Sequence, residues 1–201
     1  HVIVDEAQEL SARAGRMIFR RSPNRWMTLV GDPAQTGSPA GGEDWASALE
    51  PFVKDRWKLH ELTVNYRTPS DISAVATSIL AEVAPGQDVP TCLRETGSGI
   101  RDFPVGQIDD AVAGAVRAAG EGLVGVIAAP ERVAGLDRRF GADSVLVSDV
   151  NGAKGLEFDE VVLVEPEEIA SGSPQGFNDL YVAVTRATQG LSLVHDLPLP
   201  W

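Results

Sequence analysis

Short apolar runs alternate with helix-like segments along most of the chain, and this alternation constrains the fold more than any other feature. The runs are rich in Val, Ile and Leu, and typical helix starters, such as Asp44 and Pro130, precede or open the segments between them. Alternation of this kind is typical of β-α-β units, so the sequence predicts an α/β fold with a mostly parallel sheet. We expect strands at 2–4, 27–30, 58–64, 100–105, 123–128, 145–147, 161–164 and 191–194, and helices at 9–20, 44–52, 68–83, 108–119, 130–140 and 177–187.

The composition limits the classes of function. With 201 residues, 43% of them hydrophobic, the chain has room for one large domain or two small ones. A net charge of −12 argues against nonspecific binding of nucleic acid over a broad surface. It does not exclude a narrow local binding site. The single cysteine, Cys92, excludes an internal disulfide and fits a reducing cytosol, and no apolar run reaches membrane-spanning length. Because the chain starts inside an apolar run without a methionine, we expect it to be a piece of a longer protein.

Two adjacent carboxylates follow the first apolar run. In an open parallel sheet, ligands bind beyond the carboxyl ends of the strands, so Asp5 and Glu6 suggest a metal-phosphate site. Asp5 would hold Mg²⁺ on a nucleotide, and Glu6 would face the water that attacks the terminal phosphate. Acidic residues also favour the start of a helix, so these two residues alone fit a capping role equally well.

Polar residues also follow the next two predicted strands. The stretch 31–35, Gly-Asp-Pro-Ala-Gln, offers a charged acceptor and an amide that could read a phosphate or its water, although it also fits a common turn. The stretch 65–67, Asn-Tyr-Arg, could stack a base and clamp a phosphate. Taken alone, the tyrosine is more often a core residue and the arginine more often a solvated one.

The second half of the chain contains two further candidate ligand-binding positions and one acidic stretch without a predicted function. Residues 153–159 contain Gly155 in a turn, which we expect to open a short helix near 155–158 with free N–H groups for an anion. Arg186 lies in a nearly all-apolar helical segment, where it needs an anionic partner unless it only complements the helix dipole. The acidic stretch 165–168 is expected to be a solvated loop.

Five stretches together resemble the later motifs of superfamily 1 helicases of the UvrD/Rep type. In chain order they are VIVDEAQ, LVGDPAQ, LTVNYRTP, AKGLEFDEVVLV and LYVAVTRATQGLSLV. Each motif is weak alone, but five in the same order cover nearly the whole chain. The stretch from GDPAQTGSPAG to LTVNYRTP looks most like the HelD branch, whose members are motor ATPases that bind RNA polymerase.

The resemblance implies RecA-like P-loop NTPase domains with parallel sheets and flanking helices. Residues 1–67 would be the C-terminal part of the first motor domain, without its phosphate-binding loop. Residues 68–201 would be the complete second domain, without a large insertion. ATP and Mg²⁺ would be the cofactors, and the cytoplasm the location. The parent protein would be an ATP-hydrolysing helicase that moves on single-stranded DNA, or alternatively a HelD-like ATPase that releases RNA polymerase.

The resemblance also implies a role for each matching residue. Asp5 would bind the metal, Glu6 would activate water, and Arg67 and Arg186 would act as arginine fingers. The remaining assignments are γ-phosphate sensing by Gln8 and Gln35, adenine stacking by Tyr66, and approach to the nucleotide by Gly155 and Glu157, with Glu157 near the ribose.

Three departures from the family pattern qualify these roles. No Gly-x-x-x-x-Gly-Lys-Ser/Thr loop is present, so this chain alone should not hydrolyse ATP. Relatives that walk on DNA carry a Tyr and a Trp soon after the residue that matches Gln35; here Trp45 is a candidate base platform, although core packing also fits it. Asn151 stands where many DNA-walking relatives have a His, which makes it a second candidate contact to nucleic acid.

Overall fold

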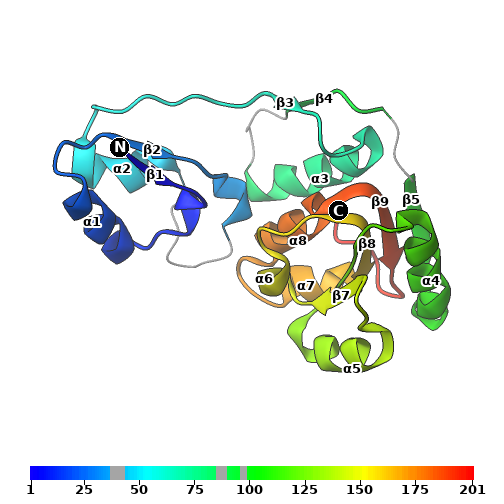
Figure 1. Ribbon diagram of the computed structural model, residues 1–201. Coiled ribbons are helices and arrows are strands. Elements are labelled where there is room, and N and C mark those ends of the chain that lie inside the picture. The colour runs from blue at the N-terminus through cyan, green and yellow to red at the C-terminus, as the bar shows by residue number, and fades with distance from the viewer. Residues whose placement is uncertain (37–43, 85–89, 96–98) are drawn as a thin grey trace. The chain divides into compact units, whose positions relative to one another are not determined.

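A computed structural model describes residues 1–36, 44–84, 90–95 and 99–201 (Figure 1). The chain forms two compact units, His1–Glu61 and Leu62–Trp201. The division falls after Glu61, whereas the sequence suggested one after Arg67; the assignment of the two parts to motor domains stays a prediction.

The first unit contains a small parallel sheet and two helices. Strands β1 (Val2–Val4) and β2 (Met27–Leu29) pair in parallel. Helices α1 (Ala12–Arg21) and α2 (Trp45–Val53) begin where Ser11 and Asp44 accept backbone N–H groups as caps. A short 3-10 turn follows each strand, η1 (Ala7–Glu9) and η2 (Pro33–Gln35). The core of the unit consists of Phe19, Leu49 and Val53, with Met27, Leu29, Phe52 and Trp57 packed against it.

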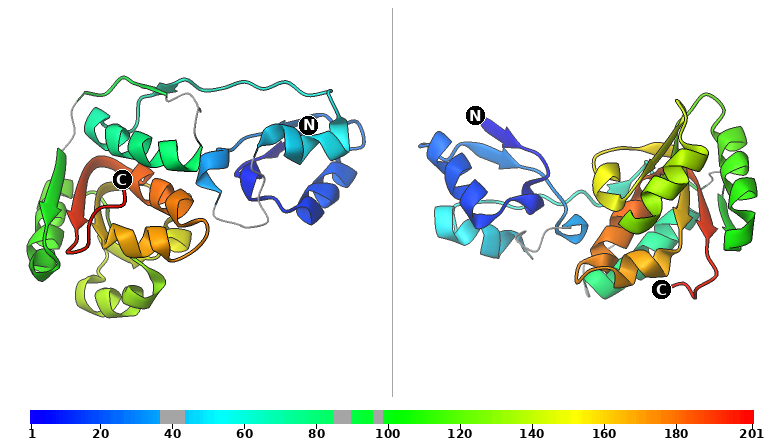
Figure 2. Two further views of the ribbon diagram at one scale, coloured as in Figure 1. Left: turned by 180° about the vertical axis from the view of Figure 1, so that it is seen from behind. Right: turned by 90° about the horizontal axis from the view of Figure 1, so that it is seen from below.

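The second unit is built on a five-stranded parallel sheet. Its strands are β5 (Gly99–Phe103), β6 (Val124–Ile127), β7 (Val145–Ser148), β8 (Phe158–Val164) and β9 (Ala187–Val194), in the spatial order β5-β9-β8-β6-β7. Most residues of the central strands β9, β8 and β6 are buried because helices cover both faces of the sheet (Figure 2).

Two cores lie on the two faces of this sheet. One joins the sheet to α3 (Ser70–Val83), α6 (Val150–Ala153), α7 (Pro166–Ser171) and α8 (Gly176–Thr185). The other joins it to α4 (Ile108–Ala119), which follows the turn η3 (Val105–Gln107), and to α5 (Pro130–Phe140). The two-sided packing confirms the predicted α/β fold with flanking helices.

A separate two-stranded pair precedes the large sheet. Strand β3 (Val64–Asn65) pairs in parallel with β4 (Thr91–Cys92). The predicted strand 58–64 is therefore wrong, because residues 58–63 belong to no helix or strand and only Val64 pairs. The apolar side chains of this segment stay largely exposed, Leu62 among them, so no core holds it extended in a sheet.

Two predictions in the second half are also wrong. The short helix expected at 155–158 lies earlier, as α6, because Asp149 caps it and Gly155 leaves the helical region with a φ of 74°. The stretch 165–168 is not a solvated loop, since Glu165 is buried and the residues after it form α7.

The helices follow the predictions more closely than the strands do. Helices α4 and α5 have the predicted bounds. Helix α3 begins after Pro69 without a side-chain cap. The Gly-, Ser- and Pro-rich stretch 36–42 lies almost wholly outside the described residues, and so does about half of the turn-rich stretch 85–99, in which Thr91–Cys92 form β4. No helix in the described part of the chain combines the length and the apolar character needed to cross a membrane.

Candidate functional site

The first candidate group lies at the carboxyl ends of β1 and β2. Asp5 and Glu6 follow β1 directly, and both side chains are exposed. Glu6 adopts a left-handed backbone with φ 50° and ψ 38°, while its N–H donates to Asp5 Oδ1 over 2.9 Å. A non-glycine residue in this region costs of order 1–3 kcal/mol, and such strain concentrates at functional positions.

Gln8 connects the two strand ends. Its side chain is only 4% exposed, and its Nε2 donates to Glu6 Oε2 over 2.6 Å. Its Oε1 accepts the backbone N–H of Asp32 over 3.2 Å. Gly31 makes room for this amide, because a Cβ there would overlap Gln8 Oε1. Gln35 joins the group by donating from Nε2 to Asp32 Oδ2 over 3.0 Å.

The geometry fits a magnesium ion shared with a phosphate. Asp5 is a hard oxygen ligand whose exposed carboxylate can still reach a cation, and Mg²⁺ is usually held by one or two carboxylates plus phosphate and water. No cluster of three or more metal-ligating side chains occurs among the described residues, so they do not form a cage made of protein alone. The metal role of Asp5 stays a prediction.

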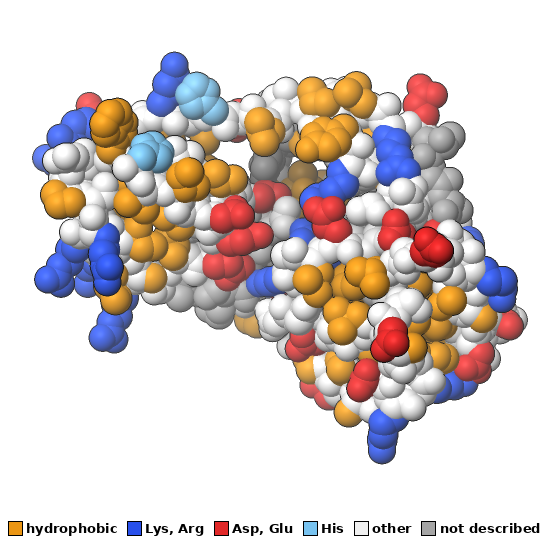
Figure 3. All heavy atoms as spheres, in the orientation of Figure 1, with side chains coloured by type: hydrophobic (Ala, Val, Ile, Leu, Met, Phe, Trp, Pro, Cys, Tyr) orange, Lys and Arg blue, Asp and Glu red, His pale blue; other side chains and the backbone are white. Residues whose placement is uncertain are grey.

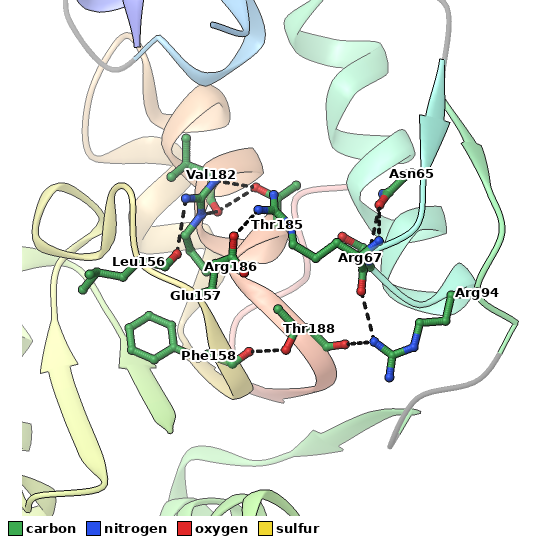
Figure 4. A network of polar contacts seen from close by, with 11 residues as sticks. Asn65, Arg67, Arg94, Leu156, Glu157, Phe158, Val182, Thr185, Arg186 and Thr188 are labelled. Carbon is green, nitrogen blue, oxygen red and sulfur yellow. Dashed lines mark hydrogen bonds and ion pairs between the residues drawn. The ribbon is translucent and has the colours of Figure 1, made fainter. Parts of the chain in front are cut away.

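The second candidate group belongs to the second unit and gathers around residues 156–157 (Figure 4). Arg67, just beyond β3, forms an ion pair with Glu157 through Nη1, and both side chains are about half exposed. Arg186 follows α8 and is 5% exposed. Its Nη1 donates to the carbonyl oxygen of Leu156 over 3.4 Å, and its Nε to that of Val182 over 3.2 Å. Two predicted arginine fingers therefore meet one short segment.

Two predicted nucleotide contacts flank this group in an open position. Gly155 has a φ of 74°, and a Cβ there would meet no atom within 4 Å. Tyr66 precedes Arg67, and its side chain is 78% exposed. Both residues are uncovered, and their roles at the nucleotide stay predictions.

Arg94 completes the group and was missed by the sequence analysis. Its Nη1 donates to the carbonyl oxygens of Arg67 over 3.1 Å and Thr188 over 2.7 Å, and its Nη2 to Gln189 Oε1. These bonds tie the segment that carries Arg67 to the start of β9 (Figure 4). Nothing local identifies Arg94, because it lies in a turn-rich stretch and acquires its partners through the pairing of β3 with β4.

The remaining candidates lie apart from these contacts in the sequence. Trp45 is the first residue of α2 and is half-buried, while Asn151 lies exposed in α6. Their roles in binding nucleic acid stay predictions.

The two candidate groups lie at opposite ends of their strands. The acids of the first unit follow the carboxyl ends of strands, whereas Glu157 and Arg186 directly precede β8 and β9.

Part of the second unit has a recognisable sequence family. Residues 144–194 match the family of the UvrD-like helicase C-terminal domain. The matched segment runs from β7 to the end of β9 and contains Gly155, Glu157 and Arg186. It covers the predicted AKGLEFDEVVLV and LYVAVTRATQGLSLV motifs, so the broad helicase resemblance is confirmed there, while the HelD branch is not.

Solved structures of helicases share the fold. The C-terminal domain of a possible DNA helicase from Lactobacillus plantarum WCFS1 has a TM-score of 0.51 at 20% identity, covering 68% of this chain and 90% of that one. The arterivirus nonstructural protein 10, a helicase in complex with DNA, has a TM-score of 0.51 at 17% identity, covering 96% of this chain. The chain spans 39% of that protein.

These identities are low enough that the likeness concerns the fold alone. The five-stranded parallel sheet flanked by helices is the RecA-like architecture of a helicase C-terminal domain. No protein of curated function matches the chain by sequence.

Proposed function

We propose that the chain is part of an ATP-driven superfamily 1 helicase or translocase, which couples ATP hydrolysis to movement on single-stranded DNA. The observation that carries this proposal is the cluster around residues 156–157. The segment that matches the helicase family supplies Glu157 and Arg186, and Arg67 reaches the same cluster from 90 residues earlier in the chain. Two guanidiniums fixed by backbone and carboxylate contacts suit the charge neutralisation that phosphoryl transfer requires.

In this proposal the two groups of residues have different tasks. Bound Mg²⁺-ATP supplies the reactive γ-phosphoryl group. Asp5 holds the metal, and Glu6 orients water, with its carboxylate steered by Gln8. Arg67 and Arg186 offset negative charge on the phosphoryl oxygens. Glu157 keeps the Arg67 guanidinium oriented until a phosphate oxygen takes its place, after which Glu157 is free to approach the ribose.

The test is ATP turnover by the full-length protein that carries this chain. Glu6→Gln keeps the shape of the side chain but removes the carboxylate, and Arg186→Ala removes a guanidinium; each should lower kcat by at least about 100-fold. Arg138→Gln removes an exposed arginine from α5 and serves as the control, with a rate close to that of the wild type. Unchanged turnover in both site variants would refute the proposal.

A second candidate function is that of a HelD-like ATPase that binds RNA polymerase and releases it from its template. The GDPAQTGSPAG stretch favours it, as does the absence of a Tyr between Gln35 and the half-buried Trp45. The two candidates separate by partner. Strong stimulation of ATPase activity by single-stranded DNA supports the translocase, whereas co-purification with RNA polymerase without such stimulation supports the second candidate.

The 201-residue chain by itself is expected to lack ATPase activity under either candidate. It contains no phosphate-cradling loop, and the β- and γ-phosphates of ATP depend on such a loop for their position.

A further inference from the structure

Helix α1 carries an unusual concentration of positive charge in a chain whose net charge is −12. Its ten residues include four arginines and no acidic residue. All four side chains are exposed, and within the described residues none of them forms an ion pair or a side-chain hydrogen bond. The four residues are Arg13, Arg16, Arg20 and Arg21.

Three of these arginines form a stripe along one side of the helix. At about 100° per residue, Arg13, Arg16 and Arg20 fall within a sector of about 60°. On the same helical wheel, the buried residues Gly15 and Phe19 are centred about 110° from the middle of the stripe, so the stripe borders the buried face of the helix. Figure 3 shows Lys and Arg side chains gathered over this part of the first unit. From Arg13 to Arg20 the stripe covers about 10 Å of the helix axis.

This arrangement costs stability when nothing binds it. Like charges three or four residues apart on a helix repel by a few tenths of a kcal/mol, and Arg13–Arg16 and Arg16–Arg20 are two such pairs. Arg20 and Arg21 lie in the last turn, where cations complement the helix dipole. Arg13 lies in the first turn, where a cation interacts unfavourably with the helix dipole. Complementing the dipole therefore explains the presence of Arg20 and Arg21 but not that of Arg13.

An exposed tryptophan, Trp26, lies between the end of α1 at Arg21 and the start of β2 at Met27. Arg25 donates from Nη1 to the carbonyl oxygen of Phe19 over 2.9 Å, and its guanidinium lies 5.4 Å from the centre of the Phe19 ring. These contacts hold the turn against the C-terminal end of α1. Trp26 follows with 72% of its surface exposed, and its ring meets the His1 ring edge-on.

We propose that the α1 stripe and Trp26 together bind single-stranded nucleic acid, with phosphates on Arg13, Arg16 and Arg20 and a base stacked on the indole ring. A strand carries one phosphate per about 3.4 Å in duplex geometry, so the stripe matches about three phosphates. Guanidinium groups pair well with phosphates, and tryptophan stacks on any base. An acidic protein surface would use the arginines but not the open aromatic ring. The surface deepens the proposed function by adding a contact outside the nucleotide site.

The experiment measures binding of the 201-residue chain to a fluorescein-labelled oligothymidylate of about 20 nucleotides by fluorescence anisotropy. Titrations at NaCl concentrations from about 50 to 200 mM give the slope of log K against log salt. The variant R13Q/R16Q/R20Q should reduce that slope by about 2, because each lost phosphate contact on a single strand accounts for about 0.7. Trp26→Ala should weaken binding about 10-fold while leaving the slope unchanged.

The matched control removes three exposed arginines from the second unit. R117Q/R138Q/R139Q changes the net charge by the same amount, and its slope should equal that of the wild type. An equal loss in both triple variants would reduce the effect to net charge and overturn the proposal, as would no binding by the wild-type chain. Tighter binding to a polyglutamate peptide than to the oligonucleotide would assign the surface to an acidic protein instead. No nucleotide is present, so the result does not depend on whether the parent hydrolyses ATP.

Discussion

At the scale of single residues, a buried carboxylate in the middle of the second unit needs both an ion-pair partner and a neighbour without a side chain. Glu160 on β8 is fully buried and pairs with Arg101 on β5, two strands away. The strand between them contributes Gly190, which pairs with Glu160 in the β8–β9 register. A Cβ at position 190 would lie 2.6 Å from Glu160 Oε1 and 2.8 Å from its carboxyl carbon.

Replacing Gly190 should therefore break the ion pair. Gly190→Ala forces the Glu160 carboxylate away from Arg101, and a buried charge that loses its partner costs about 3 kcal/mol or more. We expect the free energy of unfolding in urea to fall by about that amount. Gly135→Ala in α5 is the control, since nothing lies within 4 Å of a Cβ there and alanine favours a helix by about 0.5–1 kcal/mol. Equal stability of the two variants would contradict this account.

The same scale shows what local sequence could reveal about the site. Asp5, Glu6 and Gln35 were candidates because each follows a predicted strand within a few residues, and Gln8 became one through the resemblance to helicase motifs; their roles stay predictions. The contact of Arg67 with Glu157 and the anchoring by Arg94 were not, since these pairs are separated by 90 and 27 residues. These residues come together only in the folded chain, since β3 and β4 pair with each other and β8 belongs to a different sheet.

At the scale of elements, the region after β8 differs most from its sequence pattern. Glu165 is buried with a left-handed backbone, and its carboxylate accepts the N–H groups of Asp196 over 3.1 Å and Leu197 over 3.4 Å. Glu168 on α7 accepts two hydrogen bonds from Arg132 on α5, 2.5 and 2.6 Å long. The run of acids looked solvated because its partners lie on other elements.

The link between α5 and α7 should make stability depend on pH. The Arg132 side-chain hydrogen bond lowers the pKa of Glu168 from its ordinary value of 4.5, while burial opposes this shift. A carboxylate with a lowered folded-state pKa stabilises the protein above its unfolded pKa, and this contribution disappears as the pH falls through the folded value. Glu168→Gln should thus cost up to about 1 kcal/mol at pH 7 and almost nothing at a pH below the lowered value.

Urea unfolding of wild type and Glu168→Gln at pH 7 and in acid provides the measurement. Glu167→Gln, on the same helix, is the control and should show no such pH-dependent difference. A constant gap between wild type and Glu168→Gln at both pH values would exclude the ionised pair as its cause.

Element bounds were predictable where the signals are local. Pro130 opens α5 and the acids Asp109 and Asp110 occupy the first turn of α4, so both helices were placed correctly. The strand at 58–64 was wrong because apolar residues alone do not make a strand; a partner strand must exist, and only residues 64–65 have one.

At the scale of the whole molecule, the two units differ in how completely each buries its sheet. The second unit has five strands with a core on each face. Among its described residues, the first has two strands and a core cluster of three buried side chains, and Ile3 on β1 remains 72% exposed. Two-stranded sheets are marginal in water, and units near 60 residues bury a smaller share of their surface than larger ones.

The two units should therefore behave differently when separated. Residues 62–201 expressed alone should unfold in a single cooperative thermal transition monitored by circular dichroism, because every strand of the large sheet and both of its cores lie within them. Residues 1–61 alone should lack such a transition and be cut rapidly by protease, since three buried apolar side chains contribute only about 5–9 kcal/mol against the conformational entropy of the whole unit. A cooperative transition in 1–61, or its absence in 62–201, would show that the stability of each unit is not set by the core that its own residues form.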